Sequence, residues 1–270
     1  MTERVSVTVE AGVADVRLTR ADKRNALDMA MFDGLLAAGK EVASNPRIRA
    51  AVLSGDGAAF CAGLDLALFA AFASPDPSAQ PTAVLASREP GNPANLAQRI
   101  CTIWQEVPVP VIAAVHGVAF GGGLQLALGA DIRLGRPDAR LSVREIAWGI
   151  VPDMSGTQML RHLVGLDVAK ELTFTGREVS GIEAHNLGLI TRICDDPRST
   201  ALTLAAEMAQ RSPDALRAAK KLLNASVSCS FSEGLRLEES LQRSLLGSPN
   251  QVEAVQAAVE KRPPRFRDPE

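Results

Sequence analysis

Two glycine-rich segments could expose main-chain N–H groups to a ligand. The first, residues 59–66, follows an expected strand and a glycine turn and has small side chains at positions 61–63. The second, residues 116–131, places a glycine triplet at 121–123 between an expected buried strand and an expected buried helix. Small residues let a ligand approach the backbone, and N–H groups at a helix start favour negative charge. Either segment could therefore bind an anionic oxygen, although the first could equally reflect tight packing alone.

The glycine triplet does not match the common phosphate-binding loops. The G-x-G-x-x-G spacing of dinucleotide-binding folds is absent, and no Gly-Lys-Ser/Thr follows the glycines. A phosphate and an enolate oxygen both remain candidate ligands for this segment.

The composition limits the classes of molecule that the protein is expected to bind. The chain has 270 residues, of which 46% are hydrophobic and 22% charged, and its formal net charge is −2. No basic cluster is present, so a nucleic-acid partner is not expected. Residues 107–130 carry no charge, but two prolines, a histidine and the glycine triplet predict a buried strand, turn and helix rather than a membrane span.

The cysteines and the first residues point to a cytoplasmic protein. The four cysteines are far apart and form no CxxC pair, so we expect reduced, mostly buried thiols and no zinc site. The first residues lack a continuous apolar stretch, so no signal peptide is expected.

Hydrophobic periodicity predicts a mixed α/β core followed by helices. A hairpin is expected at residues 5–18, a helix at 29–44, and a surface excursion with five prolines at 71–95. Further strands are expected at 48–53, 109–115 and 132–134, and helices at 96–104 and from 124 onward. After Pro197 the pattern is almost wholly helical. We therefore divide the chain into an α/β core with the site, residues 1–195, and a helical part, residues 196–270.

A series of short stretches gives the chain a resemblance to a known family over nearly its whole length. They are Arg24-Asn25-Ala26-Leu27, residues 59–66, His116-Gly117 with the glycine triplet, Ala130-Asp131-Ile132-Arg133, Glu145 followed by Gly149-Ile150-Val151-Pro152, residues 156–158, residues 172–176, and Glu260-Lys261-Arg262. In this order they are similar to the crotonase superfamily, the enoyl-CoA hydratase/isomerase family.

The resemblance implies an α/β fold, the crotonase spiral of ββα units with a helical C-terminal trimerisation region. It also implies an oxyanion hole from two peptide N–H groups, which map here to Leu64 and Gly122. A thioester carbonyl becomes an enolate when a proton moves on its acyl chain, and two preorganised donors lower that barrier by roughly 3 kcal/mol each.

Acid and base residues decide which reaction runs. The resemblance implies that the family's hydratases use two glutamates to hold and activate water. Gln125 stands at the first position and Glu145 at the second. Glutamine cannot exchange a proton at neutral pH, so the two-glutamate mechanism is incomplete, although Gln125 can still orient a water or the substrate.

Asp153, eight residues after Glu145, favours isomerisation over hydration. The family's dienoyl-CoA isomerases are similar here, with a glutamate and an aspartate that flank the acyl chain and move a proton between distant carbons. Those isomerases carry an aspartate where Gln125 stands, so the match is incomplete. Alternatively, Asp153 caps the helix expected from Met154 onward.

Coenzyme A needs anchors for its phosphates and adenine, and the resemblance supplies candidates. They are Lys23 and Arg24 for the phosphates, the main chain at Ala62 and Leu64 with Asp65 beside it for the adenine, and Lys261 for a neighbouring subunit's ligand. The alternative for each charged residue is a solvated surface charge. Trp148 either lines the acyl pocket or fills the core.

The leading hypothesis is an isomerase of unsaturated acyl-CoA thioesters in which Glu145 and Asp153 move the proton. The alternatives are an enoyl-CoA hydratase with Glu145 as its only proton-transferring carboxylate, and a non-catalytic acyl-CoA binder. No metal or redox cofactor is expected, because the sequence has no metal-ligand cluster and proton transfer beside a thioester needs none; coenzyme A enters as part of the substrate. The resemblance implies a homotrimer or a dimer of trimers, with no membrane partner.

Overall fold

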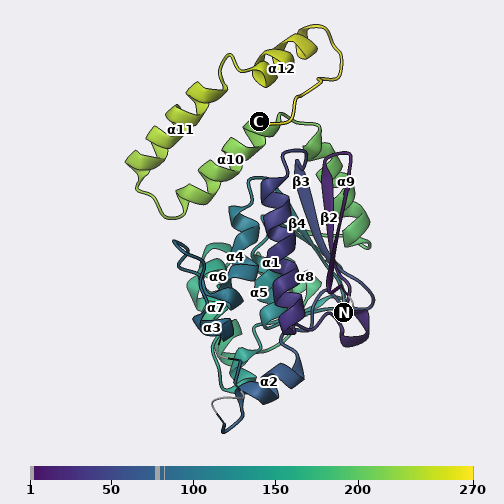
Figure 1. The fold of residues 1–270 in the computed structure, drawn as a ribbon, viewed down its shortest axis with the longest axis vertical. Helices are drawn as coiled ribbons and strands as arrows, with labels where there is room; N and C mark the ends of the chain where they lie inside the picture. The colour runs from purple at the N-terminus through teal and green to yellow at the C-terminus, as the bar shows by residue number, and fades with distance from the viewer. Residues whose placement is uncertain (1–2, 77–79, 82, 270) are drawn as a thin grey trace.

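A computed structural model describes residues 3–76, 80–81 and 83–269, and its centre is a twisted sheet (Figure 1). Six strands lie in the order β1 (Val5–Glu10), β2 (Val13–Leu18), β3 (Ala50–Gly55), β4 (Val111–Val115), β6 (Ile132–Gly135) and β9 (Arg192–Ile193). The β1–β2 hairpin is antiparallel and the other neighbours are parallel. The expected hairpin and the strands of the core are confirmed.

A second, smaller sheet lies beside the first and holds the glycine triplet in place. It contains β5 (Val118–Phe120), β7 (Arg140–Ser142) and β8 (Val179–Ser180). A bridge between Cys61 and Ala119 joins residues 59–66 to β5. The two glycine-rich segments, separate in sequence, are thereby neighbours in space.

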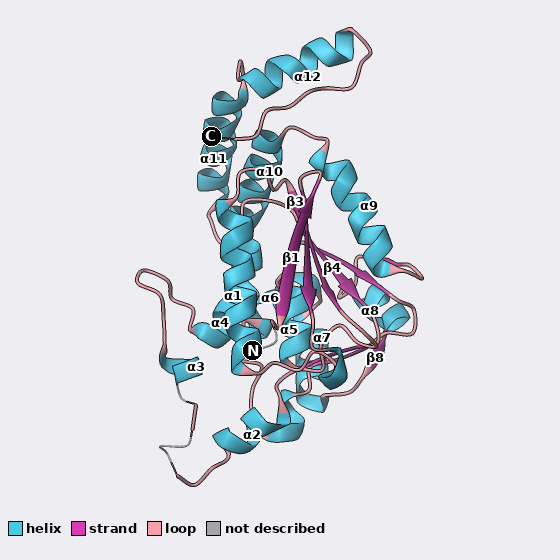
Figure 2. Ribbon diagram, turned by 45° about the vertical axis from the view of Figure 1, so that its right-hand side comes forward, coloured by secondary structure: helices cyan, strands magenta, loops and turns pink. Residues whose placement is uncertain are grey.

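Helices cover both faces of the large sheet (Figure 2). On one face lie α1 (Met29–Ser44) and α4 (Leu96–Glu106). The Asp28 side chain starts α1 by accepting the Met31 N–H. On the other face α9 (Pro197–Ala209) packs Ala201, Ala205 and Ala209 against the strands. The division expected at residue 195 therefore falls before a helix that belongs to the core.

Three helices leave the core after α9: α10 (Pro213–Ser226), α11 (Phe231–Leu245) and α12 (Pro249–Val259) (Figure 1). A buried lysine attaches the first of them. Lys220 Nζ on α10 donates to the Trp104 and Val109 carbonyls at 2.8 and 2.9 Å and lies 2.7 Å from Asp131 Oδ2. Because the ammonium group is buried, these three oxygens replace its water.

The helix α2 (Leu66–Phe72) leads into the proline-rich excursion, which contains the short helix α3 (Ala83–Ala86), with residues 77–79 and 82 outside the described part. The remaining helices are α5 (Gly122–Leu128), α6 (Gly156–Leu163), α7 (Leu166–Thr175) and α8 (Gly181–Leu187), with short 3-10 turns at Ala21–Lys23 and Glu145–Trp148. None of the described helices is long and apolar enough to cross a membrane.

Candidate active site

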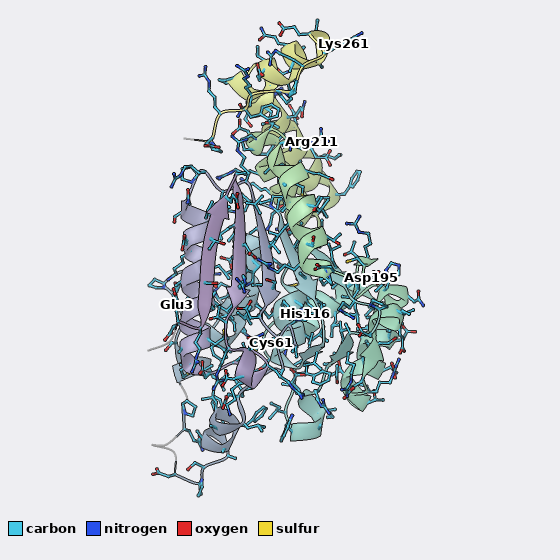
Figure 3. All side chains as sticks on the ribbon, turned by 90° about the vertical axis from the view of Figure 1, so that its right-hand side faces the viewer. Glu3, Cys61, His116, Asp195, Arg211 and Lys261 are labelled. Carbon is cyan, nitrogen blue, oxygen red and sulfur yellow. The ribbon has the colours of Figure 1, made fainter. Side chains whose placement is uncertain are left out.

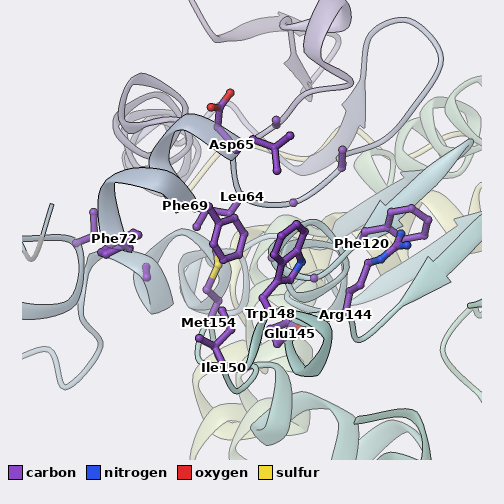
Figure 4. A pocket seen from close by; sticks show the side chains of 18 of the residues that line it. Leu64, Asp65, Phe69, Phe72, Phe120, Arg144, Glu145, Trp148, Ile150 and Met154 are labelled. Atoms are coloured by element: carbon purple, nitrogen blue, oxygen red, sulfur yellow. The ribbon is translucent and has the colours of Figure 1, made fainter. Parts of the chain in front are cut away.

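A pocket of about 1120 Å³ opens where three segments meet: residues 59–66, the junction of β5 and α5, and residues 144–154 (Figure 4). Both expected oxyanion-hole residues, Leu64 and Gly122, line it, and so do both expected acids, Glu145 and Asp153. The fold thus brings these four residues, from three separate stretches of sequence, around one cavity.

The Leu64 N–H is directed into this pocket by the strand-like pairing of its neighbours. Leu27 donates to the Gly63 carbonyl at 2.8 Å and accepts from the Asp65 N–H at 3.0 Å. Because successive peptide groups of an extended chain alternate in direction, the Leu64 N–H points away from Leu27. It donates to no residue in the described part of the chain.

The Gly122 N–H lies beside it for a different reason. Gly122 is the first residue of α5, so its N–H has no partner within the helix. A Cβ on Gly63 would lie only 3.7 Å from the Gly122 nitrogen and 2.6 Å from the Phe120 oxygen, so the two loops touch through glycine. The approach of two free N–H groups is what an oxyanion hole requires.

Glu145 stands next to this pair on a 3-10 turn rather than in the loop expected from the sequence. Its side chain is buried, and its Oε1 would be 3.2 Å from a Cβ on Gly121. Burial raises the pKa of the Glu145 carboxyl, and the negative charge of Asp153 raises it further, while the Gln125 amide opposes the rise. A buried carboxylate with a raised pKa suits a general base.

Gln125 lies behind the pocket wall and does not line the cavity. Its Nε2 donates to Glu145 Oε1 at 2.6 Å, and its Oε1 accepts the N–H groups of Met154 and Gly156, each at 2.8 Å. The sequence analysis assigned Gln125 the task of orienting water or substrate. Its position corrects that assignment, because both ends of the amide are bonded to protein.

Asp153 lines the pocket without a fixed partner. Asp153 is an exposed residue whose carboxyl makes no hydrogen bond or ion pair with another of the described residues, and partial burial in the pocket raises the pKa of that carboxyl. It does not cap the following helix, because α6 begins after Ser155, whose backbone is left-handed. The alternative role as a helix cap is therefore wrong.

Aromatic side chains close the side of the pocket near α2. The rings of Phe69 and Trp148 stack with centroids 4.9 Å apart, across the cavity from one segment to the other (Figure 4). Trp148 is 53% exposed and lines the pocket, so it is not a core residue. Phe72, Leu85 and Ile150 extend the apolar surface.

The expected coenzyme A anchors are only partly collected at the pocket. Lys23, Ala62 and Asp65 line it, whereas Arg24 does not. Figure 3 shows Lys261 at the far end of the helical extension and Cys61 within the core, so within one chain Lys261 is remote from the site. Its expected role concerns a neighbouring subunit and stays a prediction.

Two arginines at the pocket were missed by the sequence analysis. Arg20 lies 2.6 Å from Asp65 Oδ2, and Asp65 also caps α2 through the Ala67 N–H. The Arg144 guanidinium lies 4.5 Å from the centre of the Phe120 ring (Figure 4). Their closeness to Lys23 and Glu145 in sequence was the available signal, but a basic residue beside a motif does not reveal its direction.

Cys61 lies next to the residues of the oxyanion pair but does not compete with the carboxylates as a reactive group. Cys61 is fully buried, its Sγ donates to the Asn25 carbonyl, and burial raises the pKa of its thiol to about 12. It therefore stays protonated and is not a nucleophile. No cluster of three or more potential metal ligands occurs among the residues described.

Comparison with known proteins identifies this arrangement. Residues 8–269 match the sequence model of the enoyl-CoA hydratase/isomerase family. The chain belongs to that family. It is 31% identical over 263 residues to a mouse mitochondrial methylglutaconyl-CoA hydratase, covering 95% of this chain and 80% of the relative.

Solved structures of the family superimpose on almost the whole chain. An enoyl-CoA hydratase from Polaromonas sp. JS666 matches with a TM-score of 0.87 and 29% identity, over 97% of this chain and 99% of its own. A Bacillus anthracis enoyl-CoA hydratase gives 0.87 and 29%, over 97% and 98%. The predicted crotonase fold is confirmed, and the protein is an acyl-CoA-processing enzyme of this family.

Proposed function

We propose that this enzyme moves a double bond within an unsaturated acyl-CoA thioester, with Glu145 and Asp153 as the proton-transferring pair. The observation that carries the proposal is the state of the two carboxyls. Both line the cavity beside Gly122, both have raised pKa values, and Asp153 has no protein partner among the described residues. Isomerisation needs one group to accept a proton and another to return one, which such a pair can do.

In the proposed reaction the thioester oxygen accepts hydrogen bonds from the Leu64 and Gly122 N–H groups. One carboxylate removes a proton from the acyl chain, and the electron pair of the broken C–H bond moves onto the carbonyl oxygen as an enolate. The enolate then collapses while a carboxylic acid delivers a proton to a more distant carbon. The double bond shifts, and no atom is gained or lost overall.

Hydration is the second candidate, because the named relatives are hydratases. It would use Glu145 as the base for water. Gln125 argues against the two-glutamate form of that reaction, since it contributes no second acid and its amide is bonded to protein. The two reactions differ by one water in the mass of the product.

A direct test incubates the enzyme with 2-enoyl-, 3-enoyl- and 3,5-dienoyl-CoA, separates substrate and product isomers by liquid chromatography, and measures the mass of each separated product by mass spectrometry. We expect products of unchanged mass from the last two substrates. Glu145→Gln should lower that rate by about 10²- to 10⁴-fold, and Asp153→Asn should lower it for the dienoyl substrate. Asp167→Asn, an exposed carboxylate on α7, is the matched control. Rapid addition of water to 2-enoyl-CoA, with no isomerisation of the others, would establish the hydratase instead.

The helical extension supports a further part of the proposal, assembly with copies of the same chain. Large apolar side chains are exposed along it: Leu223, Val227, Phe231, Leu235, Leu246, Val252, Val255 and Val259. Exposed apolar residues gathered on one part of a molecule are typical of protein interfaces. We propose a homotrimer or a dimer of trimers, and light scattering coupled to size-exclusion chromatography measures the mass; a monomer at micromolar concentration would contradict it.

A further inference from the structure

Gln125 connects the two proton-transferring segments through three hydrogen bonds. The side chain is 2% exposed, and its amide group bonds Glu145 on one side and the backbone around Asp153 on the other. We infer that Gln125 is a positioning residue that orients the Glu145 carboxylate and keeps it ionised while fixing the loop that carries Asp153. The inference rests on the proposed role of Glu145 as the base.

The Gln125 amide donates a hydrogen bond to the Glu145 carboxylate. Glu145 Oε1 lies 2.6 Å from Gln125 Nε2, and an amide nitrogen can only donate. A donated hydrogen bond stabilises the charged carboxylate relative to the neutral acid. It also fixes the carboxyl about its last rotatable bond, next to Gly121.

The oxygen of the same amide binds the backbone of the loop that carries Asp153. Gln125 Oε1 accepts from Met154 and Gly156, the residues immediately after and three after Asp153. A Cβ on Gly156 would lie 2.6 Å from this oxygen, so the glycine lets the backbone approach. One buried side chain thereby sets the separation between the Glu145 turn and the Asp153 loop.

Several charged groups lie on the elements around Glu145. Asp153 from the neighbouring loop raises the pKa of the Glu145 carboxyl, and burial raises the pKa of the Cys101 thiol of α4, so that thiol adds no charge beside Glu145. The packed helix α7 carries Asp167, Lys170 and Glu171, none of which bonds Glu145. Arg144 beside it is directed onto Phe120 and lies 3.3 Å from Glu178. Besides the backbone of Glu145, which lowers the pKa of its carboxyl more, Gln125 is the side chain among the described residues that opposes the effects of burial and of the Asp153 charge on that pKa.

Substitution of Gln125 separates the orienting role from simple packing. Gln125→Glu keeps an oxygen for the Met154 and Gly156 N–H groups but places a carboxylate 2.6 Å from Glu145 Oε1, where two oxygens must share one proton. Gln125→Met removes the donor without adding charge. Gln158→Glu, an exposed residue on α6, is the matched control for the added charge.

The readout is exchange of the protons next to the thioester carbonyl of butyryl-CoA with D₂O, followed by NMR from pH 4 to 9. The base takes a proton from carbon and returns a deuteron, so the assay requires neither isomerisation nor hydration. The acid limb of the rate should move to higher pH in the order wild type, Gln125→Met, Gln125→Glu, with the last shift about one unit or more. Gln158→Glu should leave the limb in place.

The possible results distinguish failure of the inference about Gln125 from failure of Glu145 as the proposed base. If Glu145→Gln abolishes exchange but neither Gln125 variant moves the acid limb, the inference about Gln125 is wrong while the proposed base stands. If Glu145→Gln exchanges at the wild-type rate, the proposed base itself is wrong. Circular dichroism and the melting temperature show whether each variant is folded, and either folded Gln125 variant suffices for the test.

Discussion

The oxyanion hole can be tested by removing one main-chain N–H without deleting the residue. Gly122→Pro does this, because proline lacks the N–H and fits the first position of a helix. Gly122 occupies that position in α5, and its φ does not lie in the left-handed region. The helix loses no internal hydrogen bond, so the expected damage is chemical.

The size of the effect follows from what the substitution changes. Any Cβ on Gly122 would lie 2.8 Å from Met154 Sδ, and the sulfur must move by about 0.6 Å to reach the 3.4 Å at which ordinary contact begins. Gly122→Ala adds the same Cβ and keeps the N–H. The ratio of the two variants therefore reports the replacement of the donor hydrogen by the proline Cδ, free of the effect of the Cβ, and we expect kcat to differ by at least about 10²- to 10³-fold, or roughly 3–4 kcal/mol.

The assay measures turnover of an unsaturated acyl-CoA and, separately, proton exchange of butyryl-CoA in D₂O. Both rates should fall in Gly122→Pro relative to Gly122→Ala, since both pass through the enolate. Equal rates in the two folded variants would refute the assignment of Gly122 as an oxyanion donor. A loss confined to KM would show that the N–H binds the ground state equally well.

Other perturbations test the base, the core and the pocket. Burial raises the pKa of Glu145, so kcat/KM should fall as the pH drops through a value above the ordinary ~4.3 of glutamate; an acid limb at 4.3 contradicts this. Lys220→Met should cost about 3–5 kcal/mol in urea unfolding, against roughly 0.5 for the exposed Lys221→Met; equal costs would refute the buried anchor. Trp148→Ala removes the contact with Phe69 and should raise KM more for long-chain than for short-chain acyl-CoA, so an unchanged ratio rejects that contact.

Elements with strong local signals were predictable from the sequence. The β1–β2 hairpin has alternating apolar residues, and Asp28 marks the start of α1 by capping it. Strand β5 was missed because it has only three residues between two glycines. The position of α9 was missed because its buried face is alanine, which gives little contrast with its exposed side.

The site was predictable where it depends on the main chain and unpredictable where side chains meet. The resemblance to the family supplied Leu64 and Gly122 as the expected oxyanion pair, and glycines at 63 and 122 allow the close approach of backbone that such a pair needs. The bonds of Gln125 join residues 20, 29 and 31 positions apart, and no local pattern encodes them. The direction of Trp148 likewise depends on where α2 lies.

Because main-chain groups and side chains have separate tasks in the proposed site, substitution of side chains can change the reaction without removing the oxyanion hole. In the proposed site the thioester oxygen is held by peptide groups, which substitution of side chains at 125, 145 or 153 leaves in place. The proposed proton path, in contrast, depends on one buried amide whose replacement by a carboxylate is nearly isosteric. Gln125→Glu retains both backbone bonds of the loop and adds the second acid that the two-glutamate hydration requires. The ratio of hydration to isomerisation should therefore rise in this variant, even if its total activity falls. An unchanged ratio would mean that Asp153, and not position 125, selects the reaction.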